Sequence, residues 1–166
     1  MNLAHLHLVL NHIPVIGIPM ALVFLIYGYR TKNHSSQRFA LLVLIGLALM
    51  VLPVYLTGEP AEEVVEHLPG VAESLIESHE EAAKFSLVLT LITGATAFLA
   101  LWFQEDSRKS RLLILSVVGI GSLAMLSLVN TANLGGKVRH TEFADGAQIA
   151  KSLGDSQKLE REKDDD

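Results

Sequence analysis

Residues 8–29 read LVLNHIPVIGIPMALVFLIYGY, a stretch without a single Lys, Arg, Asp or Glu. A charge-free apolar run of about 18 residues or more is typical of a helix that crosses a membrane. Three further runs of this kind follow in the chain, at residues 39–56, 85–103 and 112–129. The sequence therefore predicts an all-α fold, an integral membrane bundle of four helices.

The charges of the connecting segments predict the orientation of these helices. Lys and Arg are retained on the cytoplasmic side of a membrane. The long connection between spans two and three holds eight glutamates before its first cation, Lys84, and so reads as outside. We therefore expect a multi-pass protein of the bacterial inner membrane with both termini outside. The cations gather in the two other loops, as Arg30, Lys32 and Arg38 and as Arg108, Lys109 and Arg111.

The connection between spans two and three predicts an outer helical extension of the bundle. Pro60 lies where a short helix starts and Pro69-Gly70 where it stops. A second helix is expected to begin near Val71 and to run without interruption into the third span. After the fourth span, the segment Asn133-Leu134-Gly135-Gly136 is expected to end the last helix.

Composition limits the domains and the chemistry. Residues 1–149 form one four-helix transmembrane domain with an outer cluster of His and Glu, and residues 150–166 form a charged tail that we expect to be disordered. The absence of cysteine excludes thiolate-ligated iron–sulfur clusters and thioether-attached c-type haem. The net charge of −5 argues against nucleic acid as a partner. Glu-x-x-His and His-Glu-x-x-His motifs do not occur, so no catalytic residues are assigned.

In the predicted topology every histidine except His34 lies on the outer side. His5 and His12 are seven residues apart and share a helix face, which we expect to face the bundle interior, whereas His7 points elsewhere. An imidazole placed in an apolar run is costly unless it is hydrogen-bonded or ligated, and a structural bond to a neighbouring helix is the simpler alternative. The stripe of His12 continues through Ile16, Pro19 and Val23.

The third and fourth helices each carry a polar stripe. We expect His79 to face the bundle interior together with Leu75, Ala82, Ser86 and Thr93. On the fourth helix, a stripe of small and polar residues predicts a close helix contact. Its members are Ser116, Gly119, Ser127 and Asn130.

Four segments of the chain carry a resemblance to a known family. They are His7-Leu-Val-Leu-Asn-His12-Ile-Pro14, Thr57-Gly58-Glu59-Pro60-Ala61-Glu62, Ser78-His79-Glu80-Glu81-Ala82-Ala83 and Asn133-Leu134-Gly135-Gly136-Lys137-Val138-Arg139-His140. Together they resemble a widespread bacterial family of predicted four-span membrane proteins that is catalogued as a domain of unknown function. The resemblance covers roughly residues 5–145 and implies a membrane four-helix bundle with outer-side histidines, but it implies no activity.

The first functional hypothesis is a membrane redox protein that holds b-type haem near the outer face. A four-helix bundle can hold a haem between imidazoles on facing helices. We predict His12 and His79 as the axial pair, with His5 and His140 as a second pair or as substitutes. Electrons would pass to or from quinone or a periplasmic cytochrome. Lys137 and Arg139 are the residues predicted to neutralise the haem propionates.

Two alternatives stay open at the level of sequence. One is a small-metal site for iron, copper or zinc, with a sensing, transport or oxidase role. The other is an accessory subunit of a larger respiratory or photosynthetic membrane complex, in which the histidines are structural. The ligands predicted for the small-metal site are His12, Glu59, His79, Glu80 and His140; His67 is expected only to decorate the short outer helix.

Overall fold

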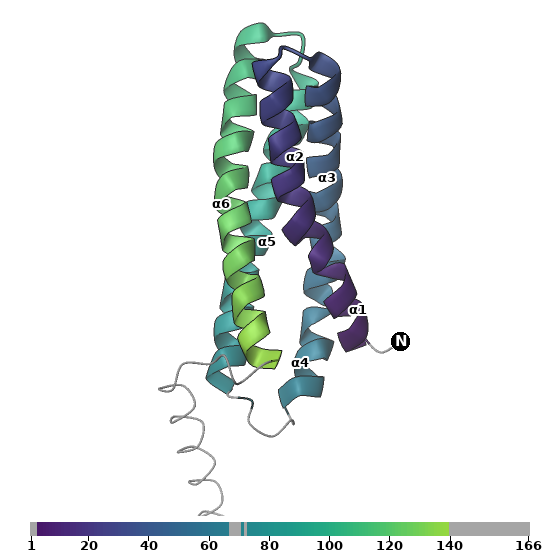
Figure 1. The fold of residues 1–166 in the computed structure, drawn as a ribbon, viewed down its shortest axis with the longest axis vertical. Helices are drawn as coiled ribbons and strands as arrows, with labels where there is room; N and C mark the ends of the chain where they lie inside the picture. Colours follow the sequence, from purple (N-terminus) through teal and green to yellow (C-terminus); the bar gives the residue numbers. More distant parts are fainter. Residues whose placement is uncertain (1–2, 67–70, 72, 140–166) are drawn as a thin grey trace, which may run out of the picture.

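The computed structural model describes residues 3–66, 71 and 73–139 of the chain. His67, His140 and the predicted tail of residues 150–166 lie outside the described residues. The described residues form α1 (Leu3–Leu10), α2 (His12–Arg30), α3 (His34–Leu56), α4 (Gly58–Glu66), α5 (Glu73–Trp102) and α6 (Ser107–Arg139) (Figure 1).

The predicted all-α four-helix bundle is confirmed. The described part of the chain holds four helical stretches that are long and apolar enough to cross a membrane. Two of these stretches join a long helix to a short one, α1 to α2 and α3 to α4, so the predicted outer extension continues the bundle. The stretches are Leu3–Arg30, His34–Glu66, Glu73–Trp102 and Arg108–Val138.

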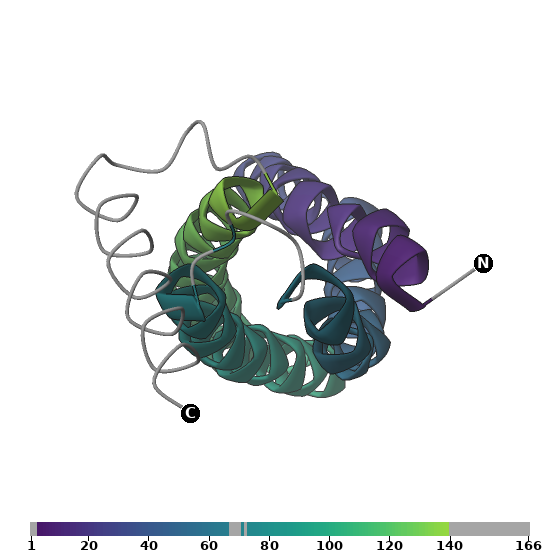
Figure 2. The same ribbon diagram turned by 90° about the horizontal axis from the view of Figure 1, so that it is seen from below.

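The four long helices form a ring, as the end-on view of Figure 2 shows. The packed neighbours are α2 with α3, α3 with α5, α5 with α6, and α6 with α2, so α2 lies diagonally opposite α5. The α2–α3 and α5–α6 connections lie at one end, which we call the loop end (Figure 1). At the other end lie α1, α4, the start of α5 and the end of α6, and we call it the histidine end.

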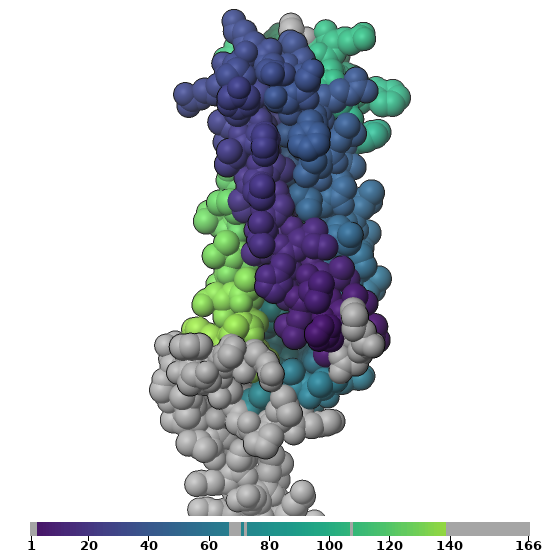
Figure 3. All heavy atoms as spheres, turned by 45° about the vertical axis from the view of Figure 1, so that its right-hand side comes forward, coloured from purple at the N-terminus to yellow at the C-terminus, as the bar shows by residue number. Residues whose placement is uncertain are grey.

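Two prolines account for the breaks near the histidine end. A proline lacks an amide hydrogen, and its ring crowds the carbonyl group four residues earlier. Pro14 therefore disturbs the helix at Leu10, where α1 ends, and Pro60 disturbs it at Leu56, where α3 ends. Beyond its break, α1 packs mainly against α4, and Figure 3 shows the dark purple side chains of α1 against the neighbouring blue to teal surface.

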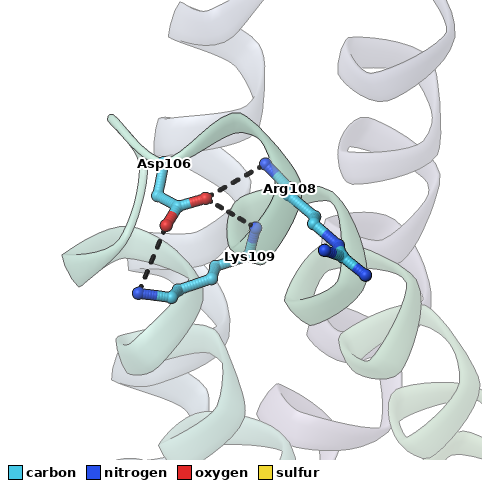
Figure 4. A network of polar contacts seen from close by, with 3 residues as sticks. All are labelled: Asp106, Arg108 and Lys109. Carbon is cyan, nitrogen blue, oxygen red and sulfur yellow. Dashed lines mark hydrogen bonds and ion pairs between the residues drawn. The ribbon is translucent and has the colours of Figure 1, made fainter.

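The loop end is held by side chains that cap the starts of helices. Asn33 accepts a hydrogen bond from the amide of Ser36 at the start of α3 (3.0 Å). Asp106 accepts hydrogen bonds from the amides of Arg108 (3.2 Å) and Lys109 (3.0 Å) and pairs with the Lys109 ammonium group (3.2 Å) (Figure 4). These bonds, first among them that from the Lys109 amide, hold the pKa of Asp106 below its ordinary value.

Two expectations about α6 are wrong. The helix continues through Gly135 and Gly136 to Arg139 instead of ending at the paired glycines. Of the stripe expected to make a close helix contact, Ser116, Gly119 and Asn130 are exposed. Ser116 tolerates that position because its hydroxyl donates to the Leu112 carbonyl of the same helix (3.0 Å). The buried stripe of α6 includes Ile114, Val117, Gly121, Ala124 and Leu128.

Candidate functional site

A polar layer lies between two apolar clusters in the bundle. The order of residues along α5 shows where this polar layer lies. Leu75 and Ile76 belong to a small cluster at the histidine end, which Val138 of α6 completes. Ala97 and Ala100 belong to the main core. The α5 residues between these clusters that face the interior include His79, Ser86, Thr90 and Thr93.

His79 lies in the seam between α5 and α6. Its ring is partly buried, and its Nδ1 atom lies 3.0 Å from the backbone carbonyl oxygen of Thr131. The ring packs against Gly135, where a β-carbon would lie only 2.9 Å from the Cε1 atom of His79. The predicted inward orientation of His79 is confirmed, since Ser86 and Thr93 on the same stripe are buried. Gly135 therefore provides the space that this imidazole occupies.

His7 lies in the corresponding seam between α1 and the end of α3. Its ring is partly buried, and its Nδ1 atom lies 3.0 Å from the Val54 carbonyl oxygen and 3.3 Å from Thr57 Oγ1. The Thr57 hydroxyl itself donates to the carbonyls of Pro53 and Val54, both at 2.9 Å. His7 lies on a different helix face from His12, as expected, but its face and not that of His12 is the partly buried one. His7 is anchored to α3 by two hydrogen-bond acceptors.

These bonds define the protonation state of both rings when they are neutral. A carbonyl oxygen has no hydrogen to donate, so the Nδ1 atoms of His7 and His79 must carry the proton. The Nε2 atom of each neutral ring then has a free lone pair. The two imidazoles belong to different elements. They come from α5 and from the continuation of α2, two elements that lie diagonally across the ring.

His12 does not face the interior, which corrects the sequence prediction. Its side chain is exposed, and its Nδ1 atom bonds to the Leu8 carbonyl oxygen of the preceding turn (2.7 Å). Two further residues of its stripe are exposed as well, Ile16 at 54% and Val23 at 66% of their surface, whereas Pro19 is partly buried. His5, seven residues before His12, is also exposed. The structure therefore partly buries His7 and His79 and leaves His12 and His5 exposed.

The other predicted ligands are placed as follows. Glu59 is exposed in the first turn of α4, and Glu80 forms an ion pair with Lys84 (2.8 Å). Lys137 is partly buried near the end of α6, and Arg139 is the last residue of that helix. Among the residues that the structure describes, no three His, Asp or Glu side chains gather closely enough to hold a metal ion.

A cavity of about 360 Å³ lies at the loop end, far along the bundle from these histidines. Its charged lining residues are Arg38, Glu105, Asp106 and Lys109, two of each sign, and Asp106 and Lys109 are paired with each other. No imidazole lines it. We therefore place the candidate site at His7 and His79, on their bonding geometry, and not in this cavity.

Sequence reasoning missed His7, Thr57 and Thr131 as members of the polar layer. One signal identifies His7 in retrospect. It lies seven residues before Pro14, on the face that continues through Ile18 and Ala21, and all three of those residues are buried.

The chain was also compared with known proteins. No protein-family model, no curated protein and no solved structure matches it. The resemblance to the family of four-span membrane proteins therefore stays a prediction. The function has to be inferred from the geometry of the site.

Proposed function

We propose that this protein is a membrane redox protein that holds b-type haem between His7 and His79 at the histidine end of the bundle. The observation that carries the proposal is the pair of inward imidazoles, each with its Nδ1 atom bound to a carbonyl oxygen of a neighbouring helix. A hydrogen bond of this kind fixes the orientation of a ligating ring and leaves Nε2 for a metal.

The donor set fits haem better than a small metal ion. Two neutral imidazoles on diagonal elements are the donors that would hold a b-type haem, and the haem would supply one-electron chemistry. A structural zinc site takes four protein ligands, and the described residues hold no cluster of three His, Asp or Glu side chains. The glycines beside the two rings, Gly58 and Gly135, keep side-chain bulk away from them.

The surrounding chain supplies the remaining functions of such a site. Bound haem provides one-electron transfer, and the redox partner would be quinone in the lipid phase or a periplasmic cytochrome. Lys137 and Arg139, at the end of α6, are positioned in the sequence to neutralise propionate groups. Leu75, Ile76 and Val138 form a buried apolar cluster at the histidine end.

A visible absorption spectrum of the purified full-length protein tests this proposal. We expect a strong haem band that shifts and sharpens when dithionite is added, because reduction of a six-coordinate haem changes its spectrum. Iron analysis should give about one iron per chain. A colourless protein that carries zinc or copper would favour the small-metal alternative. A colourless, metal-free protein that co-purifies with a larger complex would favour the accessory-subunit alternative.

We further propose that the histidine end lies outside the cytoplasm, in the bacterial inner membrane. The loop end carries Arg30, Lys32 and Arg38 beside Arg108 and Arg111, and cationic loops stay on the cytoplasmic side. Cysteines introduced at Ser35, in the first turn of α3, and at Glu73, the first residue of α5, lie at opposite ends of the bundle. An impermeant thiol reagent added to intact cells should label the Glu73→Cys variant alone. Labelling of Ser35→Cys alone would reverse the orientation.

A further inference from the structure

The α5–α6 seam contains a buried hydroxyl without a protein partner. Thr90 is 1% exposed, and within the described residues its Oγ1 is the one buried side-chain nitrogen or oxygen that lacks a hydrogen bond. The other threonines of α5, Thr93 and Thr96, each donate to the carbonyl four residues earlier (2.8 Å). Thr90 makes no such bond, although an unpaired polar group at this depth is costly.

One turn away, three hydroxyls form a chain whose direction is fixed by their hydrogens. Thr131 Oγ1 donates to the Ser127 carbonyl oxygen (3.0 Å). Ser86 Oγ lies 2.8 Å from Thr131 Oγ1 and 2.7 Å from Ser127 Oγ. Each hydroxyl has a single hydrogen, so Ser86 must donate to Thr131, and Ser127 must donate to Ser86. Ser127 Oγ is therefore the first donor in this series of hydroxyls. It can still accept a hydrogen bond, but it has no second hydrogen to donate.

The spacing between Thr90 and this chain suits one water molecule. Residues four apart on a helix have β-carbons about 5–6 Å apart, and two hydrogen bonds of about 2.8 Å cover that separation. A water between Thr90 and Ser86 accepts the unused Thr90 hydrogen, donates one hydrogen to the remaining lone pair of Ser86 Oγ and has its second hydrogen for the neighbouring Ser127 oxygen. It thereby reaches the two to four polar partners that buried waters have.

We propose that the α5–α6 seam binds an internal water molecule among the hydroxyls of Thr90, Ser86 and Ser127. The bound water joins Thr90 to the hydroxyl chain and extends a continuous polar seam from the His79 turn into the apolar part of α5. This site is made by hydroxyl groups alone and does not depend on the proposed haem.

The direction in which the melting temperature changes when Thr90 loses its hydroxyl tests the proposal. Thr90→Val keeps the shape of the side chain and removes the hydroxyl. Loss of a satisfied hydrogen bond should lower the melting temperature by about 2–4 °C. Removal of an unsatisfied hydroxyl, or of one that turns back to its own helix, would leave the melting temperature unchanged or raise it. Thr93→Val is the matched control, because Thr93 bonds only to its own helix, and its effect should be smaller.

A second measurement detects the water directly in the intact wild-type protein. Solid-state NMR in lipid bilayers should show magnetisation transfer from water to the Thr90 side chain and none to Ala97 in the main core. Thr90→Ser, which keeps the hydroxyl, should keep the transfer at residue 90. Transfer to Thr90 together with a lower melting temperature of Thr90→Val supports the site. A dry Thr90, or a Thr90→Val variant as stable as the wild type, overturns it.

Discussion

Replacement of His79 by alanine is expected to abolish the visible absorption bands of the purified protein, and replacement of His7 by alanine is expected to do the same. Both rings are partly buried, and the carbonyl oxygens of Thr131 and Val54 hold their Nδ1 atoms, which leaves each Nε2 atom as the ligand in the proposed site. Loss of an outer-shell partner already costs about 10–100-fold in metal affinity, and loss of the ligand itself should cost more. The measurement is haem per protein, from the absorbance of the reduced sample.

Exposed histidines provide matched controls for this prediction. His12→Ala and His34→Ala should retain the haem, because both side chains are exposed and His34 lies at the loop end. Circular dichroism and gel filtration identify any variant that is merely misfolded, and imidazole in the buffer should restore part of the band to a folded His79→Ala variant. Loss of the band in His12→Ala with retention in His7→Ala would reinstate the axial pair predicted from the sequence.

The fold could be predicted because long charge-free apolar runs identify membrane-spanning helices. Four charge-free runs require helices, since lipid offers no partner for free backbone groups. The helix faces could not be predicted from hydrophobicity. In water an apolar stripe marks the buried side, but in lipid both sides are apolar, so the exposed stripe of His12, Ile16 and Val23 resembles the buried stripe of His7, Ile18 and Ala21. Only the acceptors on α3 identify the inward imidazole.

The prediction that the paired glycines end the last helix is wrong for a related reason. In soluble proteins, a glycine after a helical run commonly ends the helix. In a membrane bundle the helix persists, because an unpaired carbonyl is costly and glycine serves to bring surfaces together. Gly135 accordingly lies inside α6 and makes room for His79.

Gly94→Ala is expected to destabilise the bundle by about 1–3 kcal/mol, the usual cost of overpacking. Gly94 of α5 meets Ala48 of α3, and a β-carbon at Gly94 would overlap the β-carbon of Ala48. That methyl group is fixed to the α3 backbone and has no rotamer to adopt, so the two helices must separate. In lipid, van der Waals packing of this kind drives helix association. The measurement is the free energy of unfolding in a mild detergent titrated with sodium dodecyl sulfate.

Two comparisons isolate this contact from the helix propensity of alanine. Gly46→Ala and Gly119→Ala add the same methyl group where nothing lies within 4 Å, so they should be neutral or stabilising by up to about 1 kcal/mol. The double variant Ala48→Gly with Gly94→Ala moves the methyl group from α3 to α5 and should recover most of the lost stability. The coupling between the two substitutions, read from the double-mutant cycle, is the decisive quantity. If the two effects simply add, Gly94 and Ala48 do not touch, and the α3–α5 packing described above is wrong.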